Sequence, residues 1–566
     1  LLSDILAREL DVRLERTSGR LQLLRAYEDL YRKEVRERGL LTFADLPVLL
    51  NPTQEGTPFL SHQPGEVERL WMDYRMDANF DHWFFDEFQD TSNLQWNAMS
   101  NLASEVAQGN DEGRSLFAVG DPKQAIYAWR GGDHSLFEKI GTRLSLESEP
   151  MNQSWRSVPA VLELVNGVFS GIGQIDGFSN DATARWADAW MPHEACKPNQ
   201  DLPGFSRLYF VDRLESRSFG DLDYQETIFP LMLDLLKRVR PQDGGWDCGI
   251  LVSRNKHIPM VVDFLRSEGI EVAGDAAVAE GLDNPATSLL YSLVKFMAHP
   301  EDSFCRQHLL MSPLREEINQ VGDDLLPNFH QQLCSGGFEC ALNPWLEHLG
   351  IPESDTFSRM RVDGFMDLCR VFDESGSRDI DAFLQFVGNH KSRPSGSGGA
   401  VRVMTIHRSK GATLDMTIVL GMDGDAIDTL RKDHIHVGRD ANRKPAWVME
   451  LPPEPLCQGD SVLRTAYTQA RNEATYENLC KLYVGLTRAR YGLYVISPRP
   501  TASANYPKLL EQTLGIDPEK CSPLGSESDS WESRCRIVWE SRGVDGGSVD
   551  SDWSRNPDLI GRKGSV

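Results

Sequence analysis

The chain lacks long hydrophobic runs and clustered cysteines. Its 566 residues contain no uninterrupted apolar stretch of about eighteen residues, so no membrane-spanning helix is predicted. The ten cysteines are scattered without a CxxC pair, and Cys334 and Cys340 are too isolated to indicate a metal site. A reduced cytoplasmic protein with buried thiols is expected. The opening residues, LLSDILARELDVRLERTSGR, form an amphipathic helical pattern of mixed charge rather than a signal peptide.

An excess of basic residues is also absent. The formal net charge of −25 argues, taken alone, against a nucleic-acid partner. Binding depends on a local basic groove, however, and clusters of basic residues do exist. They are Arg402, His407, Arg408 and Lys410, and Lys481, Arg488 and Arg490. Clusters of this size are more often solvated surfaces than ligand sites. They support a nucleic-acid partner only in combination with other features.

Two short apolar runs within residues 83–132 end in charged residues. The first leads into FFDEFQDT, with Asp86 and Glu87, and the second, SLFAV, ends in GDPKQAIYAWRGGD. Buried parallel strands deliver catalytic groups at their carboxyl ends in this way. The first carboxylate can hold Mg²⁺ and the second can orient or deprotonate an attacking water. Two acidic residues after a strand are by themselves a weak indication of a catalytic site, because the end of a strand is more often simply solvated. The whole string, with its Gln and aromatic residues, is a specific indication.

Three later segments also place charged residues at a turn beside a predicted strand or helix. MNQSWRS at 151–157 precedes a proline-started helical pattern, where Arg156 could meet an anion and Trp155 could lie flat on a base. Residues 401–421 indicate a strand, a polar turn and a second strand. Residues 477–497 indicate a helix with Arg488 near its end, followed by a strand. The recurring strands, turns and helices predict an α/β architecture.

These strings together resemble the superfamily 1 DNA helicases of the UvrD/Rep/PcrA type, and among them the RecB/AddA branch, the helicase subunits of ATP-dependent exonucleases. DEFQDT is similar to the Walker B motif and GDPKQAIYAWRGGD to the third helicase motif. NQSWRS, TIHRSKG and YVGLTRAR resemble the fourth, fifth and sixth motifs. Two weaker matches are LLTFADL at 40–46 and GILVSRN at 249–255. The resemblance implies two RecA-like domains, each a parallel sheet flanked by helices, with mainly helical accessory insertions.

The resemblance implies a nucleotide site. Asp86 would hold Mg²⁺, Glu87 would be the catalytic base and Gln124 would sense the γ-phosphate of ATP. Arg156 and Arg488 would act as arginine fingers, whose charge stabilises the transition state. Trp155 occupies the position where the family stacks an aromatic ring on adenine. The other residues assigned to nucleotide binding are Gln89, Gly411 and Thr413, although many relatives carry Glu at the last position.

The resemblance also implies a path for DNA. Tyr127 and Trp129 would stack on bases of single-stranded DNA, because every base offers a π-face. Arg130, Thr405 and His407 would lie along that path. A lone aromatic residue is more often part of a core, but within the YAWRGG string the stacking role is favoured.

The chain departs from the family in its phosphate-binding loop. No GxxxxGK[ST] occurs in the 566 residues, and the nearest string, SKGAT at 409–413, belongs to the fifth motif. The simplest account is a fragment whose N-terminal segment is missing, and the alternative is a degenerate subunit that does not hydrolyse ATP. Retention of Glu87, Gln124, Arg156 and Arg488 favours the first. No acidic-plus-lysine nuclease site is visible either.

The expected organisation follows from the motif order. Residues 1–80 would form accessory domain 1B with a connecting helix, and 81–150 the second half of the first RecA-like domain. Residues 151–300 and 398–500 would build the second RecA-like domain, and 301–397 an inserted helical domain (2B-like). KSRPSGSGGA at 391–400 is expected to be a flexible linker, and the 501–566 tail to be partly disordered.

The expected function is ATP-driven movement along single-stranded DNA in the 3′→5′ direction, with duplex unwinding, in DNA repair and recombination. ATP and Mg²⁺ are the expected cofactors. The expected partners are single-stranded and duplex DNA and a second helicase or nuclease subunit, with no membrane. The alternative is a non-hydrolysing DNA-binding or scaffolding subunit of a recombination complex.

Overall fold

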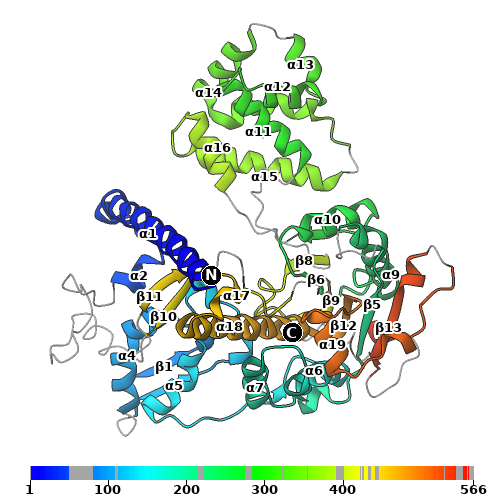
Figure 1. The fold of residues 1–566 in the computed structure, drawn as a ribbon. Coiled ribbons are helices and arrows are strands. Elements are labelled where there is room, and N and C mark those ends of the chain that lie inside the picture. Colours follow the sequence, from blue (N-terminus) through cyan, green and yellow to red (C-terminus); the bar gives the residue numbers. More distant parts are fainter. Residues whose placement is uncertain are drawn as a thin grey trace. The chain divides into compact units, whose positions relative to one another are not determined.

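Contacts within the chain divide it into two compact units, shown as a ribbon in Figure 1. One comprises Leu1–Val272 with Gly398–Val566, and the other Ala273–Ser397. The computed structural model describes residues 2–49, 81–108, 113–214, 221–274, 284–320, 324–352, 355–389, 401–420, 422, 426–430, 435–439, 445–527, 530–542, 552–556 and 559. The expected linker at 391–400 lies outside the described residues.

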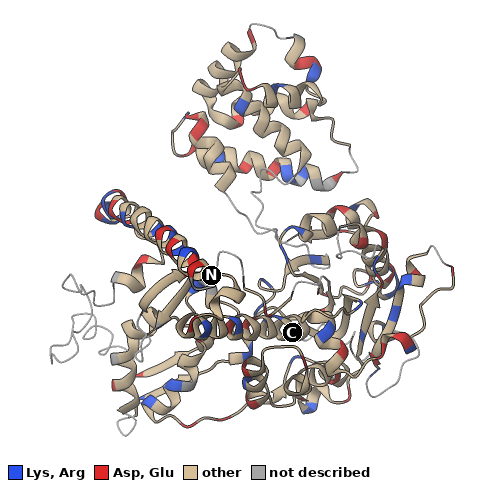
Figure 2. Ribbon diagram, viewed as in Figure 1, with Lys and Arg blue, Asp and Glu red and all other residues tan. Residues whose placement is uncertain are grey.

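The larger unit begins with a long helix, α1 (Leu2–Glu34), followed by the short α2 (Asp45–Leu49). Acidic and basic residues alternate along α1 rather than segregating (Figure 2). Arg13, Arg16 and Arg20 of α1 all reach Glu450, whose side chain is 2% exposed. Glu450 ends β11 (Pro445–Glu450), which pairs antiparallel with β10 (Ile435–Arg439). This cluster of charges fixes α1 to the hairpin.

The two apolar runs around the DEFQDT string form the predicted parallel strands. β1 (His82–Phe85) pairs in parallel with β2 (Ser115–Ala118). On one face Trp83 and Phe85 pack against α4 (Asn93–Gln108), and nearby residues contact α5 (Ser135–Leu144). On the opposite face Phe84 and Phe117 are 74% and 52% exposed. Parallel sheets are normally covered on both faces, so the described part of this sheet has one apolar face uncovered.

A seven-stranded sheet belongs to the same unit, and its strands lie in the order β13-β5-β12-β9-β6-β8-β7. Strands β5, β12, β9, β6 and β8 run parallel, and β13 is antiparallel to β5. Their bounds are β5 (Phe205–Val211), β6 (Cys248–Val252), β7 (Val272–Gly274), β8 (Val401–Thr405), β9 (Leu414–Val419), β12 (Ala489–Pro498) and β13 (Cys535–Ser541). The predicted strands of the fifth and sixth motifs are thus confirmed as β8, β9 and β12.

Helices cover this sheet. The proline-started helix predicted after Arg156 is α6 (Pro159–Ser170), which packs on β5, β12 and β13. The others are α7 (Asn180–Ala189), α8 (Asp221–Asp223), α9 (Phe229–Val239), α10 (His257–Ser267), α17 (Glu454–Cys457), α18 (Ser461–Leu486), α19 (Tyr506–Thr513) and α20 (Trp531–Arg534). A short parallel pair joins β3 (Gln153–Ser154), just before α6 in sequence, with β4 (Glu194–Ala195), which follows α7.

Two boundaries expected from sequence are wrong. The tail after residue 500 is not separate from the second sheet, since it supplies α19 and the edge strand β13. The helical unit begins at Ala273 rather than at 301, because α11 (Pro285–Ala298) shares its core. The remaining helices of that unit are α12 (Ser303–Leu310), α13 (Arg315–Gln320), α14 (Leu325–Leu342), α15 (Thr356–Asp373) and α16 (Ile380–Asn389). No described helix is long and apolar enough to cross a membrane.

Candidate functional site

Asp86 and Glu87 follow directly after β1, at its carboxyl end. The backbone N–H of Glu87 donates to Asp86 Oδ1 at 2.8 Å, and both side chains are exposed. Glu87 has φ 50° and ψ 38°, the left-handed region that residues other than glycine rarely occupy. Such strain persists where the surrounding structure holds it, and it is concentrated at functional sites. The structure therefore presents Glu87 on a strained turn, next to an exposed carboxylate.

Gln89 holds this turn against the loop after β2. Its Nε2 donates to Glu87 Oε2, and its Oε1 accepts from the backbone N–H of Asp121 at 2.9 Å. Gln89 is 1% exposed, and a Cβ on Gly120 would lie 2.6 Å from its Oε1. The structure thus gives Gln89 a buried, positioning role toward Glu87. Its expected contact with nucleotide stays a prediction.

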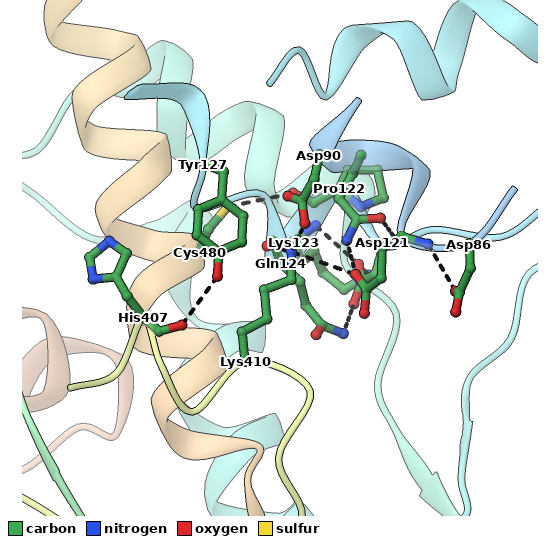
Figure 3. A network of polar contacts seen from close by, with 12 residues as sticks. Asp86, Asp90, Asp121, Pro122, Lys123, Gln124, Tyr127, His407, Lys410 and Cys480 are labelled. Atoms are coloured by element: carbon green, nitrogen blue, oxygen red, sulfur yellow. Dashed lines mark hydrogen bonds and ion pairs between the residues drawn. The ribbon is translucent and has the colours of Figure 1, made fainter. Parts of the chain in front are cut away.

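Gln124 lies in the loop after β2, on a 3₁₀ turn formed by Pro122–Gln124. Asp121 caps that turn by accepting from the backbone N–H of Lys123 at 3.0 Å. The other oxygen of Asp121 accepts from Gln124 Nε2 at 3.1 Å. Figure 3 shows Gln124 beside Asp121 and Lys410. Gln124 and Glu87 therefore belong to two adjacent loops that Gln89 ties together.

Arg156 and Arg488 come together from segments that are far apart in sequence. The backbone N–H of Leu414 donates to the carbonyl of Arg488 at 3.0 Å, which places Arg488 at the amino ends of β9 and β12. Arg156 Nε donates to Thr413 Oγ1 at 3.0 Å and its Nη1 to the carbonyl of Thr487 at 3.1 Å. Thr413, expected at the nucleotide, is thus a partner of Arg156.

Neither guanidinium group is neutralised by a carboxylate among the described residues. Arg488 is 1% exposed and donates to the carbonyl of Val484 at 2.9 Å and to Thr487 Oγ1 at 2.8 Å. Burial, aided by the charge of Arg156, lowers the pKa of Arg488 to about 10, whereas the charge of Glu87 opposes this. Burial likewise lowers the pKa of Arg156. Two cations, one buried and one half-buried, that lack a carboxylate partner among the described residues fit an anionic ligand.

The remaining residues expected at the nucleotide are peripheral in the structure. Trp155 is 72% exposed, and its carbonyl accepts from Asn199 Nδ2 at 3.1 Å. Its ring is therefore available to stack, and that role stays a prediction. Gly411 has φ 79°, so it allows the turn between β8 and β9 that presents the preceding residue, Lys410.

Lys410 was not assigned a role from sequence, yet it connects the fifth motif with the Walker B motif and the third motif. Its side chain, 6% exposed, forms ion pairs with Asp90 and, at 3.5 Å, with Glu87 Oε2. Its Nζ also donates to the carbonyl of Gln124 at 2.8 Å (Figure 3). The only signal in the sequence was its place in a basic cluster beside the SKG string. Asp90 and Lys410 are thus added to the candidate site.

The residues expected along the DNA path are only partly accessible. Tyr127 donates to the carbonyl of His407 at 3.4 Å, and its ring centroid lies 5.1 Å from Lys410 Nζ and 5.6 Å from the Arg130 guanidinium. Thr405 is 6% exposed, which argues against a direct contact in this conformation. Burial, aided by Lys481, lowers the pKa of His407 to about 4. The side chain of Trp129 lies outside the described residues, so its stacking stays a prediction.

Comparison with known proteins agrees with this geometry. Residues 4–144 match the family model described as UvrD/REP helicase N-terminal domain. Over these residues the chain is similar to the UvrD/REP helicases. It is 23% identical over 561 residues to an ATP-dependent helicase/nuclease subunit of Geobacillus kaustophilus, covering 84% of this chain and 44% of that protein. For the protein of the same name from Staphylococcus aureus the identity is 22%, covering 82% and 42%. The chain thus spans less than half the length of the curated relatives it matches.

The residues present fit the ATP and Mg²⁺ that the resemblance to these helicases implies. Arg156 and Arg488 supply positive charge that no carboxylate in the described part of the chain neutralises, as an anionic polyphosphate requires. The described residues contain no group of three or more His, Cys, Asp or Glu that could hold a metal by themselves. Mg²⁺ in nucleotide sites typically takes one or two carboxylates and completes its shell with phosphate oxygens and water. Asp86, exposed beside Glu87, fits that requirement.

Proposed function

We propose that this chain forms part of an ATP-dependent DNA helicase, which moves 3′→5′ along single-stranded DNA in repair and recombination. The observation that carries the proposal is the convergence near Glu87 of Arg156 and Arg488, which have no carboxylate partner among the described residues. Burial lowers the pKa of both arginines, and the charge of Glu87 opposes that shift. A site with a base on one side and two cations on the other suits phosphoryl transfer to water.

Each protein group has a distinct task in this proposal. ATP with Mg²⁺ supplies the phosphoanhydride that is hydrolysed. Glu87 accepts the proton of the attacking water, and Gln89 fixes its carboxylate. Arg156 and Arg488 stabilise the charge that develops on the transferred phosphoryl oxygens. Gln124 senses the γ-phosphate and transmits its loss to Tyr127, which lies three residues further along the same loop, and to the neighbours of Tyr127.

Such a site also requires a phosphate-binding loop to hold the phosphates of ATP. The 566 residues contain no GxxxxGK[ST] string, and the relatives are more than twice as long as their matched part. We propose that this loop is supplied by a longer polypeptide, of which this chain is a portion. That protein would act in the cytoplasm with a second helicase or nuclease subunit.

The test uses the full-length protein and two partial duplexes, one with a 3′ and one with a 5′ single-stranded tail. The proposal expects ATP-dependent strand displacement from the 3′-tailed duplex only. If the protein is instead a scaffolding subunit, it should bind DNA but show no ATP turnover with either substrate. Unwinding confined to the 5′-tailed duplex would leave the helicase function intact but refute the polarity.

A further inference from the structure

The 3₁₀ turn Pro122–Gln124, called the sensor turn below, packs against helix α18. Cys480 of α18 is fully buried, and its S–H donates to the carbonyl of Pro122 at 3.5 Å (Figure 3). The same helix ends at Leu486, two residues before Arg488. The turn that carries Gln124 and the segment that carries Arg488 therefore share one support.

Lys123 is the side chain of the sensor turn that reaches α18. Its Nζ lies 2.8 Å from Asp121 Oδ1 and 5.8 Å from the centroid of the Tyr483 ring, a distance at which a cation is attracted to the face of an aromatic ring. The other oxygen of Asp121 accepts from Gln124 Nε2 at 3.1 Å. The side chain of Lys123 is 15% exposed, although an ion pair with a residue two positions away does not require burial. Lys123 thus links α18, through Asp121, to the side chain of Gln124.

The Tyr483 ring is itself held in place from several sides. Its hydroxyl is hydrogen-bonded to His193 Nε2 at 2.6 Å. Asn166 of α6 in turn holds the backbone of His193, because its Oδ1 accepts from the N–H and its Nδ2 donates to the carbonyl, both at 2.8 Å. The ring also packs against three aromatic residues, Phe169, Trp186 and Trp190. The ring is therefore a rigid platform for the ammonium group of Lys123.

We propose that Lys123 is a positioning residue for ATP hydrolysis, which seats the sensor turn on the ring of Tyr483. Gln124 on that turn and Arg488 beyond α18 are then held so that both meet the same phosphate. This inference rests on the function proposed above. No bond to Lys123 is made or broken in the reaction. The face of the Tyr483 ring, rather than its hydroxyl, carries the contact.

The first test measures DNA-stimulated ATP hydrolysis by the full-length protein. Lys123→Met keeps the length of the side chain but removes its charge. We expect it to lower kcat by about 10-fold to 10²-fold, the scale of a catalytic group misplaced by about 1 Å, with a much smaller change in KM. Lys123→Arg should restore kcat, because a guanidinium group also stacks on an aromatic ring. A wild-type kcat in Lys123→Met would overturn the inference.

A matched control is Lys508→Met, which removes a lysine that is ion-paired with Glu511 on α19 and lies outside the candidate site. Its kcat should equal that of the wild type. A fall in kcat as large as that of Lys123→Met would show that the loss is not specific to the sensor turn, and it would overturn the inference.

Two substitutions of Tyr483 separate its ring from its hydroxyl. Tyr483→Phe keeps the ring and should keep kcat near that of the wild type, whereas Tyr483→Leu should lower it as Lys123→Met does. Because the two residues act through one contact, the double variant Lys123→Met/Tyr483→Leu should be no slower than the slower single variant. If the two defects multiply, or if Tyr483→Phe is as slow as Tyr483→Leu, the inference fails.

The second test needs no nucleotide and uses the reactivity of Cys480. Burial raises the pKa of this thiol well above its usual value, so iodoacetamide should modify it very slowly in the wild type. If Lys123 seats the sensor turn, the labelling rate of Cys480 in Lys123→Met, followed by peptide mass spectrometry, should rise by about 3-fold or more. Cys248, buried in β6, should stay protected, and the exposed Cys334 should react equally in both proteins.

Unchanged labelling of Cys480 in Lys123→Met would overturn the inference, whatever the rate of ATP hydrolysis. Equal increases at Cys480 and Cys248 would do the same, because they would indicate general unfolding. A wild type that hydrolyses no ATP would instead refute the proposed function, while a selective increase at Cys480 would still support the seating of the turn by Lys123.

Discussion

The substitution Arg488→Met tests whether Arg488 serves catalysis or the stability of the fold. Burial and the charge of Arg156 lower the pKa of Arg488 from its ordinary value to about 10. At about 1.4 kcal/mol per pH unit, that gap means that the buried charge destabilises the fold by about 3 kcal/mol at neutral pH. Methionine fills a similar unbranched space without the charge. The electrostatic part of the substitution should therefore favour folding.

The lost hydrogen bonds offset only part of this gain. Arg488 donates to the carbonyl of Val484 and to the hydroxyl of Thr487. The Val484 carbonyl also accepts from the backbone N–H of Thr487 at 3.3 Å, so it keeps a partner in the variant. Each lost bond is worth about 1 kcal/mol. We therefore expect the Tm of Arg488→Met without ligand to be unchanged or higher.

Activity should change in the opposite direction. Loss of an arginine finger lowers kcat by about 10³-fold or more, so ATP turnover by the full-length Arg488→Met protein should be close to background. Added pyrophosphate should raise the Tm of the wild type more than that of the variant. The control is Arg207→Met: Arg207 is 8% exposed but paired with Glu540, so removing it should lower the Tm clearly. A large fall in Tm with near-normal turnover in Arg488→Met would refute this reasoning.

Four further predictions concern the same site. Glu87→Gln in the full-length protein should abolish turnover and spare ATP binding, as measured by steady-state kinetics and nucleotide titration; near-normal turnover would exclude Glu87 as the base. The 566 residues expressed alone should bind MgATP weakly and hydrolyse it negligibly, because they contain no GxxxxGK[ST] loop; robust DNA-stimulated turnover would contradict this. Trp129→Ala should weaken binding of single-stranded DNA of any sequence by about 1–3 kcal/mol, whereas a large fall in Tm with unchanged affinity would indicate a core residue instead. His407, with its pKa lowered to about 4, should stay neutral from pH 6 to 8, and an imidazole NMR titration within that range would disprove it.

The elements around the motifs were predictable because their sequence signals are local. Phenylalanine- and valine-rich runs that end in charged residues became β1 and β2, and Pro159 marked the start of α6. The helix of the sixth motif was predicted within 477–497 with Arg488 near its end. It begins upstream of that string, at Ser461, and ends at Leu486, two residues before Arg488. Its amphipathic pattern is weak because many of its residues are partly buried on several sides.

The features that were missed depend on contacts between distant segments. Strand β13 has an irregular burial pattern, and only its antiparallel pairing with β5 makes it part of the sheet. Helix α11 resembles any buried helix in sequence, and its packing with α14, α15 and α16 alone assigns it to the helical unit. Lys410 and Asp90 are 320 positions apart, so no local pattern could have paired them. The exposed positions of Asp86 and Glu87, in contrast, could be predicted from sequence, because both residues directly follow a recognisable strand.

The most direct measurement of the central claim is the rate of ATP hydrolysis by the full-length protein, with and without single-stranded DNA, in the wild type and in Arg156→Met. If Arg156 and Arg488 together receive the phosphoryl charge opposite Glu87, DNA should stimulate turnover in the wild type. The loss of Arg156 should remove that stimulation while the protein still binds DNA. DNA-stimulated hydrolysis at the wild-type rate in Arg156→Met would contradict the account.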